Sequence, residues 1–315
     1  AVRGEGGILT NVRSERFMQR YGAKRMELSA RDVVARAIYN EIISRRGTKH
    51  DGVWLDISHK NVAYIKKRLP KMYEQFKAVG IDITRQKMEV APTAHYSMGG
   101  ISTRLNGETN IKNLLAVGEC TGDVHGANRL GGNSLAETIV YGKIVGNYAA
   151  KIAKSKIVEI SLDEARKIED QIQMKKSGSI APEKIKEELQ QIMWKHAGIV
   201  RDEKNLKIGL MKLHSLEKRL GSIKIRNTRD LVGAMDARNM LMLAKFVVQG
   251  ALLRRESRGA HYRKDYARME KHPRHVMLKK AGSKAKFYYK KTPKPRGRLK
   301  RFLKTHAGGE YHYLE

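Results

Sequence analysis

The sequence predicts an α/β (α+β) architecture in the first half of the chain and an all-α domain of three helices in the second half. Residues 114–118 are small or apolar and end at a glycine, and a loop rich in glycine and asparagine (126–134) leads into a helix-periodic stretch ending near Ala150. The order strand, glycine turn, loop and helix is typical of α/β construction. Helical periodicity returns in three later segments, which predict an antiparallel three-helix bundle: 182–195, 202–219 and 229–255.

Shorter elements are expected before the glycine-rich loop. Residues 4–7 and 11–20 are interpreted as turn and strand material. A helix is expected to begin after Ser29, which has the hydroxyl that an N-cap needs. Residues 52–57 alternate like a strand, and residues 60–77 are helix-periodic with a break at their proline.

Turn and tail positions complete the predicted layout. The pair Asn106-Gly107 is a hairpin turn sequence, and 114–118 is interpreted as a buried strand. Ser134 is the expected N-cap of the helix that follows the loop. Beyond about Asp265 the aliphatic periodicity fades and lysine and arginine dominate, so this tail is expected to be irregular.

Composition narrows the class of protein. The 315 residues have a formal net charge of +32, which favours anionic ligands such as nucleic acid, lipid headgroups or dicarboxylates, although a generally basic proteome explains it equally well. No run of about 18 apolar residues is present to span a bilayer. A charged stretch follows Ala1, which argues against a secretory signal and favours a chain that begins mid-gene or after processing. The one cysteine, Cys120, rules out an internal disulfide.

Seven stretches, in the same order along the chain, resemble the flavoprotein subunit of succinate dehydrogenases and fumarate reductases. The most specific is the eleven-residue run His-Gly-Ala-Asn-Arg-Leu-Gly-Gly-Asn-Ser-Leu at 125–135. The resemblance covers nearly everything up to about Asp265, and the basic tail is less like the family. The other six stretches are 3–7, 15–18, 31–36, 92–101, 118–119 and 256–261.

The resemblance implies a site for a C4 dicarboxylate, fumarate or succinate. His95 and Arg129 match the family's carboxylate-binding positions, and an arginine fork can grip a carboxylate through two charge-assisted hydrogen bonds. Arg31 matches the family's proton donor, and Arg3 matches the arginine of the relay that refills it. The glutamate of that relay would lie just before Ala1. Because arginine has a pKa above about 12, it can act as an acid only when desolvated and close to other cations.

The resemblance also implies FAD as the cofactor. Glu119 matches a flavin contact, as do the amides of Ser134 and Leu135, because a helix N-terminus can stabilise negative charge on the flavin ring. No Gly-x-Gly-x-x-Gly follows a strand in this chain. The adenosine half of FAD is therefore expected to be bound by sequence upstream of position 1, and the 315-residue chain alone is expected to hold FAD weakly.

The family's domains would divide the chain into four parts. Residues 1–92 correspond to a portion of the capping (substrate) domain, and residues 93–150 to the C-terminal part of the FAD-binding domain. A helical C-terminal domain is expected over 151–260, followed by the basic tail over 261–315.

Partners follow from the cysteine count and from the resemblance. A single cysteine excludes a Cys-ligated cluster within the chain, so electrons are expected to come through the flavin from a separate partner. The resemblance implies that this partner is an iron–sulfur subunit. No metal site and no nucleic-acid partner are expected. Membrane association is expected only through partner subunits, with the protein in the cytoplasm or on the cytoplasmic face of the membrane.

Three alternatives stay open. L-aspartate oxidase shares several of these stretches, but we expect Ala-Ser or Ser-Ser where this chain has Gly131-Gly132, and residues 98–103 also favour the fumarate side. The charge and the aromatic-dotted tail suggest a nucleic-acid binder, although no recognised nucleic-acid motif supports it. The tail could instead dock an acidic partner subunit. The aromatic residues of the tail are Phe287, Tyr288, Tyr289 and Phe302.

Overall fold

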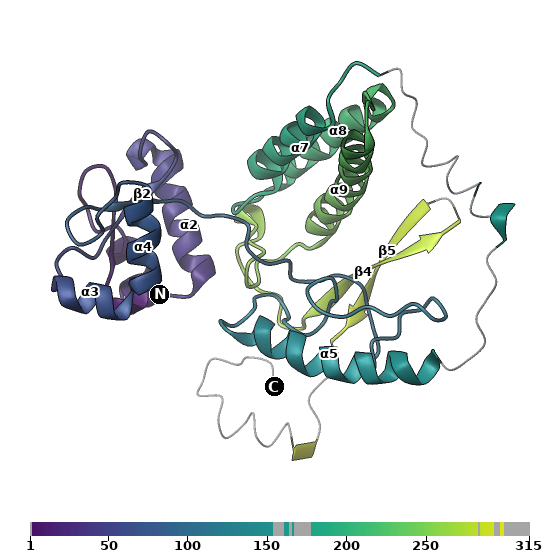
Figure 1. Ribbon diagram of the computed structural model, residues 1–315, viewed down its shortest axis with the longest axis horizontal. Helices are drawn as coiled ribbons and strands as arrows, with labels where there is room; N and C mark the ends of the chain where they lie inside the picture. Colours follow the sequence, from purple (N-terminus) through teal and green to yellow (C-terminus); the bar gives the residue numbers. More distant parts are fainter. Residues whose placement is uncertain are drawn as a thin grey trace. The chain divides into compact units, whose positions relative to one another are not determined.

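The computed structural model divides the chain into two compact units (Figure 1). The first comprises Ala1–Ile101 with Glu119–Val124, and the second comprises Ser102–Gly118 with His125–Glu315. The structure describes residues 2–153, 161–163, 166, 178–282, 284–292 and 297–298. Most of the helical pattern expected between Leu162 and the bundle lies outside these residues.

The first unit packs short helices around a small antiparallel sheet. Its strands are β1 (Ile8–Thr10), β2 (Val53–Asp56) and β3 (Met88–Val90), in the order β1-β2-β3. Leu9 lies opposite Leu55, and Trp54 lies opposite Glu89. The helical segments are η1 (Val2–Glu5), α1 (Met18–Gly22), η2 (Met26–Leu28), α2 (Arg31–Glu41), η3 (Ile42–Arg46), α3 (Val62–Arg68) and α4 (Pro70–Ala78).

Two of the strongest local predictions for this unit are confirmed. The predicted strand at 52–57 is β2. The predicted break at Pro70 separates α3 from α4, because Leu69 leaves the helical conformation and proline occupies the first position of α4. Proline disfavours helical geometry in the residue before it, and its own missing N–H costs nothing at a helix start.

Two other predictions for this unit are wrong. The stretch 11–20 is not a strand: α1 begins at Met18, and the fully buried Phe17 contacts Tyr21 edge to face. Ser29 is not the N-cap of α2. Its N–H donates to Met26 O and closes η2, so Ala30 precedes α2 without a side-chain cap. A serine just before a helix is therefore not always its N-cap, because here Ser29 ends the preceding turn instead.

A buried carboxylate ties the first unit together. Glu41, at the end of α2, is fully buried, and it accepts hydrogen bonds from Asn11, Arg20, Tyr21 and Arg46 at 2.8–3.2 Å. Burial is the largest single effect on the pKa of Glu41 and raises it. The hydrogen bonds together outweigh burial and lower this pKa to about 2. Glu41 therefore stays ionised and joins the segment after β1, α1, α2 and η3.

The second unit contains the predicted three-helix bundle. Its helices are α7 (Pro182–Ala197), α8 (Glu203–Lys218) and α9 (Thr228–Leu253), which contact one another pairwise. Asp202 and Asn227 cap α8 and α9, since their side chains accept from the backbone N–H of Asn205 and Asp230. The core holds Ile185, Leu189, Leu206, Leu213, Leu241 and Val248.

A long helix lies outside the bundle in the same unit. Helix α5 (Asn133–Ile152) confirms the helix predicted after the glycine-rich loop. Ser134 is its second residue, and the N-cap is Gly132 in a left-handed conformation with φ of 85°. The prediction that Ser134 is the N-cap is therefore wrong by two positions, because only a residue that tolerates positive φ fits there.

The stretch 114–118 does not form the predicted buried strand. It forms a β-bridge between Leu115 and Glu108, with backbone hydrogen bonds on either side from Ala116 N to Gly107 O and from Thr109 N to Leu114 O. Leu114 and Val117 are 47% and 40% exposed, so its apolar character alone did not decide its burial. The turn predicted at Asn106-Gly107 forms, with Gly107 at φ of 84°, but it joins no named strands.

The start of the tail is regular, contrary to the prediction. Strands β4 (Arg274–Ala281) and β5 (Lys284–Lys291) form an antiparallel hairpin that follows η5 (Lys264–Tyr266). Phe287 lies edge to face against Phe246 of α9, with ring centroids 6.5 Å apart. Alternation places Phe287 and Tyr289 on one face and Lys286, Tyr288 and Lys290 on the other, so the basic composition concealed a strand pattern.

No helix among the described residues is long and apolar enough to cross a membrane.

Candidate active site

The loop 125–132 in the second unit is fastened to the helix that follows it. Nε2 of His125 lies 2.7 Å from Oε2 of Glu137 in α5, and the two side chains are only 9% and 3% exposed. A buried carboxylate and imidazole each need a partner, so this pair fixes the start of the loop on α5. His125 belongs to the run 125–135 but was given no role from the sequence, and Glu137, which lies two residues after that run, was not singled out.

Arg129 lies at the start of α5. Its Nη1 atom donates to Ser134 Oγ at 3.1 Å and approaches Leu130 O at 3.5 Å. The neighbouring Gly126 and Gly132 both have positive φ, and a Cβ atom at either would meet open space. Two predicted site residues, Arg129 and Ser134, are therefore in direct contact.

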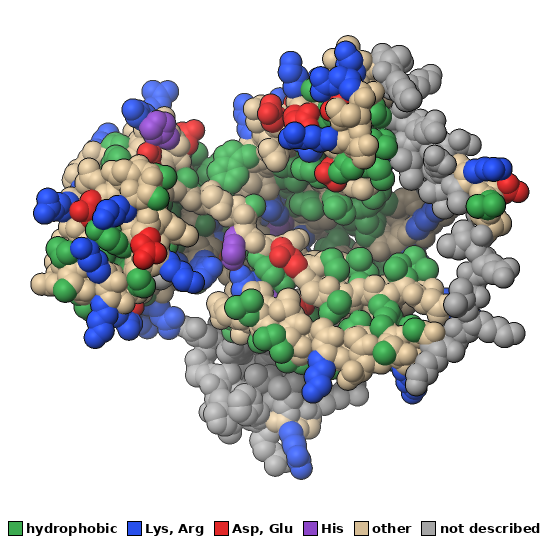
Figure 2. All heavy atoms as spheres, in the orientation of Figure 1, with side chains coloured by type: hydrophobic (Ala, Val, Ile, Leu, Met, Phe, Trp, Pro, Cys, Tyr) green, Lys and Arg blue, Asp and Glu red, His purple; other side chains and the backbone are tan. Residues whose placement is uncertain are grey.

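The first turn of α5 presents backbone N–H groups and exposed apolar side chains. Ser134 and Leu135 are its second and third residues, and the N–H of Leu135 reaches back to Gly132 O at 3.2 Å. Leu135 and Ile139 are 71% and 74% exposed, and hydrophobic side chains gather over α5 in Figure 2. A helix N-terminus with its partial positive charge beside an apolar surface suits a planar, electron-rich ligand.

Arg3 and Arg31 are electrostatic neighbours in the first unit. Nη1 of Arg3 donates to the backbone oxygen of Glu27 at 2.7 Å. Burial, and then the positive charge of Arg31, lowers the pKa of Arg3, while the charge of Glu27 opposes this. Arg31 is the first residue of α2 and is exposed. This juxtaposition of two arginines meets one condition for an arginine acid, a nearby cation. The other condition, desolvation, is not met by the exposed Arg31 in this structure.

The carboxylate of Glu27 organises the surroundings of Arg3. It is buried and accepts two hydrogen bonds from Arg16, at 3.0 and 2.6 Å, and one from the N–H of Leu9 at 3.2 Å. Burial is the largest single effect on the pKa of Glu27 and raises it, but the hydrogen bonds together outweigh burial, so this pKa is lowered. Sequence reasoning assigned Glu27 no role, because nothing in its local sequence marks it as buried.

His95 and Glu119 lie on two segments of the first unit that pair with each other. Oε1 of Glu119 accepts from the N–H of Ser97 at 2.9 Å, and Ile101 N donates to Cys120 O at 2.8 Å. Gly100 has φ of 150°, and a Cβ there would lie 2.3 Å from Cys120 O, so only glycine fits. His95 is exposed on this paired segment.

The predicted site residues thus fall into two groups. The first unit holds Arg3, Arg31, His95 and Glu119, and the second holds Arg129, Ser134 and Leu135. Within the described residues no cluster of three or more His, Cys, Asp or Glu side chains has the arrangement of a metal site.

Comparison with known proteins gives these groups a common context. Residues 1–135 match the family described as an FAD binding domain, and residues 186–294 match the family described as the fumarate reductase flavoprotein C-terminus. The chain belongs to the succinate dehydrogenase and fumarate reductase flavoprotein family. FAD is the cofactor of this family. The second match runs through β4 and β5, so the likeness extends beyond the predicted limit near Asp265.

Individual relatives agree with this assignment. The chain is 47% identical over 274 residues to one of the subunits of the fumarate reductase (CoM/CoB) of Methanothermobacter marburgensis, covering 84% of this chain and 49% of that protein. The L-aspartate oxidase 2 of Ralstonia nicotianae is 40% identical over 268 residues, covering 85% of this chain and 46% of that protein. The chain spans about half the length of these curated relatives.

Solved structures of the family share the fold. The flavoprotein FrdA of Escherichia coli quinol fumarate reductase superposes with a TM-score of 0.84 at 33% identity, over 92% of this chain and 55% of that one. Sdh1 of Mycobacterium smegmatis gives 0.81 at 33% identity, over 99% of this chain and 55% of that one. The predicted combination of a flavoprotein fold with a helical C-terminal domain is confirmed at this level.

Proposed function

We propose that this chain is part of a flavoprotein that transfers a hydride between FAD and a C4 dicarboxylate, interconverting fumarate and succinate. The observation that carries the proposal is the position of Arg129. Its guanidinium lies beside Ser134 at the start of α5, and the neighbouring glycines Gly126 and Gly132 face open space. A cation at a helix N-terminus is suited to an anionic substrate held against a flavin. The 47% identity to a protein named fumarate reductase supports it.

The residues of the chain fit the cofactor of the family. We propose the N–H of Ser134 as a donor to the pyrimidine edge of a flavin, because the N–H of Leu135 already donates to Gly132 O at 3.2 Å. Leu135 offers an exposed apolar side chain beside it. Glu119 supplies a carboxylate suited to ribityl or ribose hydroxyls. We propose Glu119, Ser134 and Leu135 as flavin contacts. Bound FAD would supply the acceptor or donor of the hydride.

The other proposed site residues have two tasks, substrate binding and proton transfer. We propose that Arg129 and His95 bind the two carboxylates of the substrate, and that Arg31 delivers the proton to the carbon that does not receive the hydride. We propose that Arg3 returns a proton to Arg31, which is supported by the lowered pKa of Arg3, caused first by burial and then by the charge of Arg31. Because Arg31 is exposed here, the desolvation that an arginine acid needs would have to come from bound substrate and flavin.

We propose a separate iron–sulfur subunit as the electron partner, supported by the likeness to the flavoproteins of fumarate reductase and succinate dehydrogenase. The single cysteine of this chain leaves no Cys-ligated cluster within these 315 residues. A relative whose name pairs fumarate reductase with CoM and CoB makes these two coenzymes the reductants to test first. Membrane association, where it occurs, is proposed to be through partner subunits.

L-aspartate oxidase is the second candidate, supported by a relative at 40% identity. The conformation of Gly132 favours the fumarate and succinate reaction. With φ of 85° this position is strained for any residue with a Cβ, whereas we expect a serine there in the oxidases. The backbone of this loop at position 132 therefore suits a glycine that the alternative would lack.

Flavin reoxidation tests the proposal. Chemically reduced holoenzyme mixed anaerobically with fumarate should regain its oxidised flavin absorbance, and malonate should slow this competitively. Reduced flavin that stays reduced at saturating fumarate would overturn the proposed function.

A further inference from the structure

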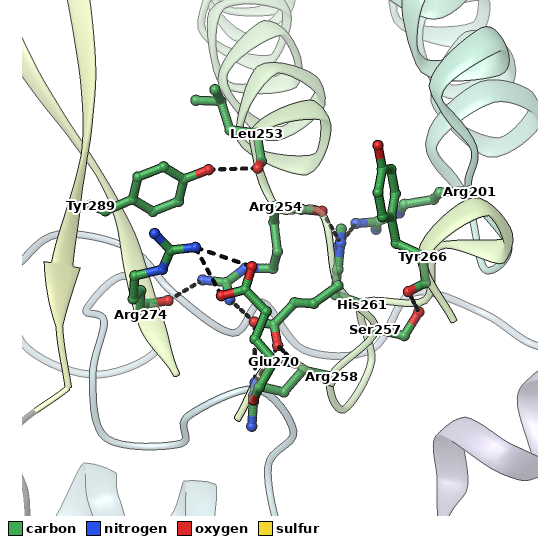
Figure 3. Close-up of polar contacts among 11 residues, drawn as sticks. Arg201, Leu253, Arg254, Ser257, Arg258, His261, Tyr266, Glu270, Arg274 and Tyr289 are labelled. Atoms are coloured by element: carbon green, nitrogen blue, oxygen red, sulfur yellow. Dashed lines mark hydrogen bonds and ion pairs between the residues drawn. The ribbon is translucent and has the colours of Figure 1, made fainter. Parts of the chain in front are cut away.

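The carbonyl groups at the end of helix α9 accept hydrogen bonds from side chains of later segments. The last carbonyl groups of a helix have no partner within it and must be satisfied from elsewhere. Ala251 O and Leu252 O accept from Arg263, at 2.7 and 3.3 Å, and Leu253 O accepts from the hydroxyl of Tyr289 at 2.6 Å. Arg254 O lies 3.2 Å from Nε2 of His261 (Figure 3). The end of α9 is thereby fastened to the segment 257–263.

The hydrogen bonds of His261 determine its protonation state. Its Nδ1 atom lies 3.0 Å from Nη1 of Arg201, and a guanidinium can only donate. Nδ1 must therefore accept, and Nε2 must carry the proton that it donates to Arg254 O. Burial, and then the charge of Arg201, lowers the pKa of His261 to about 4. The hydrogen bond to the Arg254 carbonyl opposes this shift, and the charges of Arg254 and Arg263 add to it. His261 is neutral at physiological pH.

The neutral His261 closes a tight turn. Arg258 N donates to His261 O at 2.8 Å, and His261 N donates to Arg258 O at 3.1 Å. The guanidinium of Arg258 binds the buried carboxylate of Glu256 at 2.9 Å and the backbone oxygen of Glu270 at 2.7 Å. Both ends of the turn 258–261 are therefore held by buried polar contacts.

The outer side of this turn touches the loop that contains Arg129. Ala260 N donates to Ala127 O at 3.0 Å. Gly259 has φ of 56°, and a Cβ there would lie 2.3 Å from Ala127 O and 2.6 Å from its carbonyl carbon. Real Cβ atoms do not approach backbone so closely, so a side chain at 259 would have to displace Ala127. Ala127 precedes Arg129 by two residues.

We propose that the turn 258–261, held by the Arg201–His261 hydrogen bond, is a positioning element that sets where Arg129 presents its guanidinium. The loop 125–132 then has two independent attachments. The His125–Glu137 pair fixes its start on α5, and the Ala260–Ala127 bond fixes its middle on the C-terminal segment. This inference rests on the proposed role of Arg129 in carboxylate binding.

Gly259→Ala in the holoenzyme tests the proposal by malonate titration of the flavin spectrum. Because a displacement of about 1 Å at a binding group can cost on the order of 100-fold, we expect malonate affinity to fall by roughly 10- to 100-fold with flavin content unchanged. Gly282→Ala is the matched control, since Gly282 also has positive φ (60°) but a Cβ there would meet open space. Equal malonate affinity in the two variants would overturn the proposal.

Substitutions of His261 give a second test, in case Gly259→Ala does not fold. Gln can accept from Arg201 and donate to Arg254 O, whereas Leu can do neither. We expect His261→Gln to keep malonate affinity within a few-fold of wild type and His261→Leu to lose roughly 10-fold or more, as expected for a displaced binding group. Equal affinities in the Gln and Leu variants would contradict the proposal. A wild-type holoenzyme that binds no malonate would instead overturn the proposed function, and this inference with it.

Discussion

His125 and Glu137 form a buried pair, with Nε2 of the imidazole 2.7 Å from Oε2 of the carboxylate. The two residues are 12 positions apart, and the segment between them contains every predicted site residue of the second unit, Arg129 in the loop and Ser134 and Leu135 in the first turn of α5. This pair therefore joins the two ends of the segment that holds those residues.

Glu137→Ala should weaken dicarboxylate binding. Removing the carboxylate leaves a buried imidazole nitrogen without its partner, at a cost of about 1–3 kcal/mol. We expect lower malonate affinity and a lower free energy of unfolding in urea. Glu137→Gln keeps an oxygen that can accept from Nε2–H, so most of both quantities should be retained. Wild-type malonate affinity in Glu137→Ala would show that this pair does not position the loop.

Arg31→Gln should separate binding from turnover. Loss of a positioned proton donor typically slows catalysis about 10²–10⁴-fold. Flavin content and malonate affinity should stay near wild type, because we assign Arg31 to neither task. The exposed Arg25 offers a control, and Arg25→Gln should retain activity. If Arg31→Gln reduces fumarate at a tenth of the wild-type rate or faster, Arg31 is not the acid.

Arg129→Ala should remove a carboxylate anchor. Leaving one desolvated substrate carboxylate without its charged partner costs about 2–5 kcal/mol. Affinities for fumarate and malonate should fall together while flavin stays bound. Arg104→Ala is the control, since Arg104 in the same unit lies on the surface and pairs with Glu108 at 3.3 Å.

Ser134→Ala separates anchoring from bracing. It removes the oxygen that Arg129 contacts but leaves the guanidinium in place. If Arg129 only braces the loop, Arg129→Ala and Ser134→Ala should both lower flavin occupancy to a similar extent. Full flavin occupancy with unchanged malonate affinity in Arg129→Ala would remove Arg129 from the site.

Glu41 should make the first unit sensitive to acid. Its pKa is about 2 in the folded protein, against an ordinary value of 4.5, so its stabilisation is fully present above pH 4.5 and is lost as the pH falls toward 2. A shift of this size corresponds to roughly 3 kcal/mol. Urea unfolding between pH 7 and pH 3 should show this loss, and Glu41→Gln should reduce the pH dependence. The exposed Glu74 provides the control, because Glu74→Gln should leave the dependence unchanged.

Features set by neighbouring residues could be predicted from the sequence. The break at Pro70 and the three helices of the bundle follow from backbone restriction and 3.6-residue periodicity. The run 125–135 indicated the loop and the helix that positions Arg129.

Features set by distant contacts could not be predicted in this way. The packing of Gly259 on Ala127 joins segments far apart in the chain, and no local pattern marks it. The β4–β5 hairpin was missed because lysines outnumber the apolar residues of its packed face. The burial predicted for 114–118 failed because apolar character does not supply the neighbouring strands that would cover it.

Anaerobic reduction of the oxidised flavin decides whether the site oxidises succinate or its 2-amino derivative L-aspartate, with the two compounds compared on one preparation of holoenzyme. We predict that succinate bleaches the flavin absorbance, that malonate prevents this, and that L-aspartate at the same concentration leaves the flavin oxidised. Bleaching by L-aspartate but not by succinate would contradict the proposed function and would assign the site of Arg129 to an amino-acid oxidase.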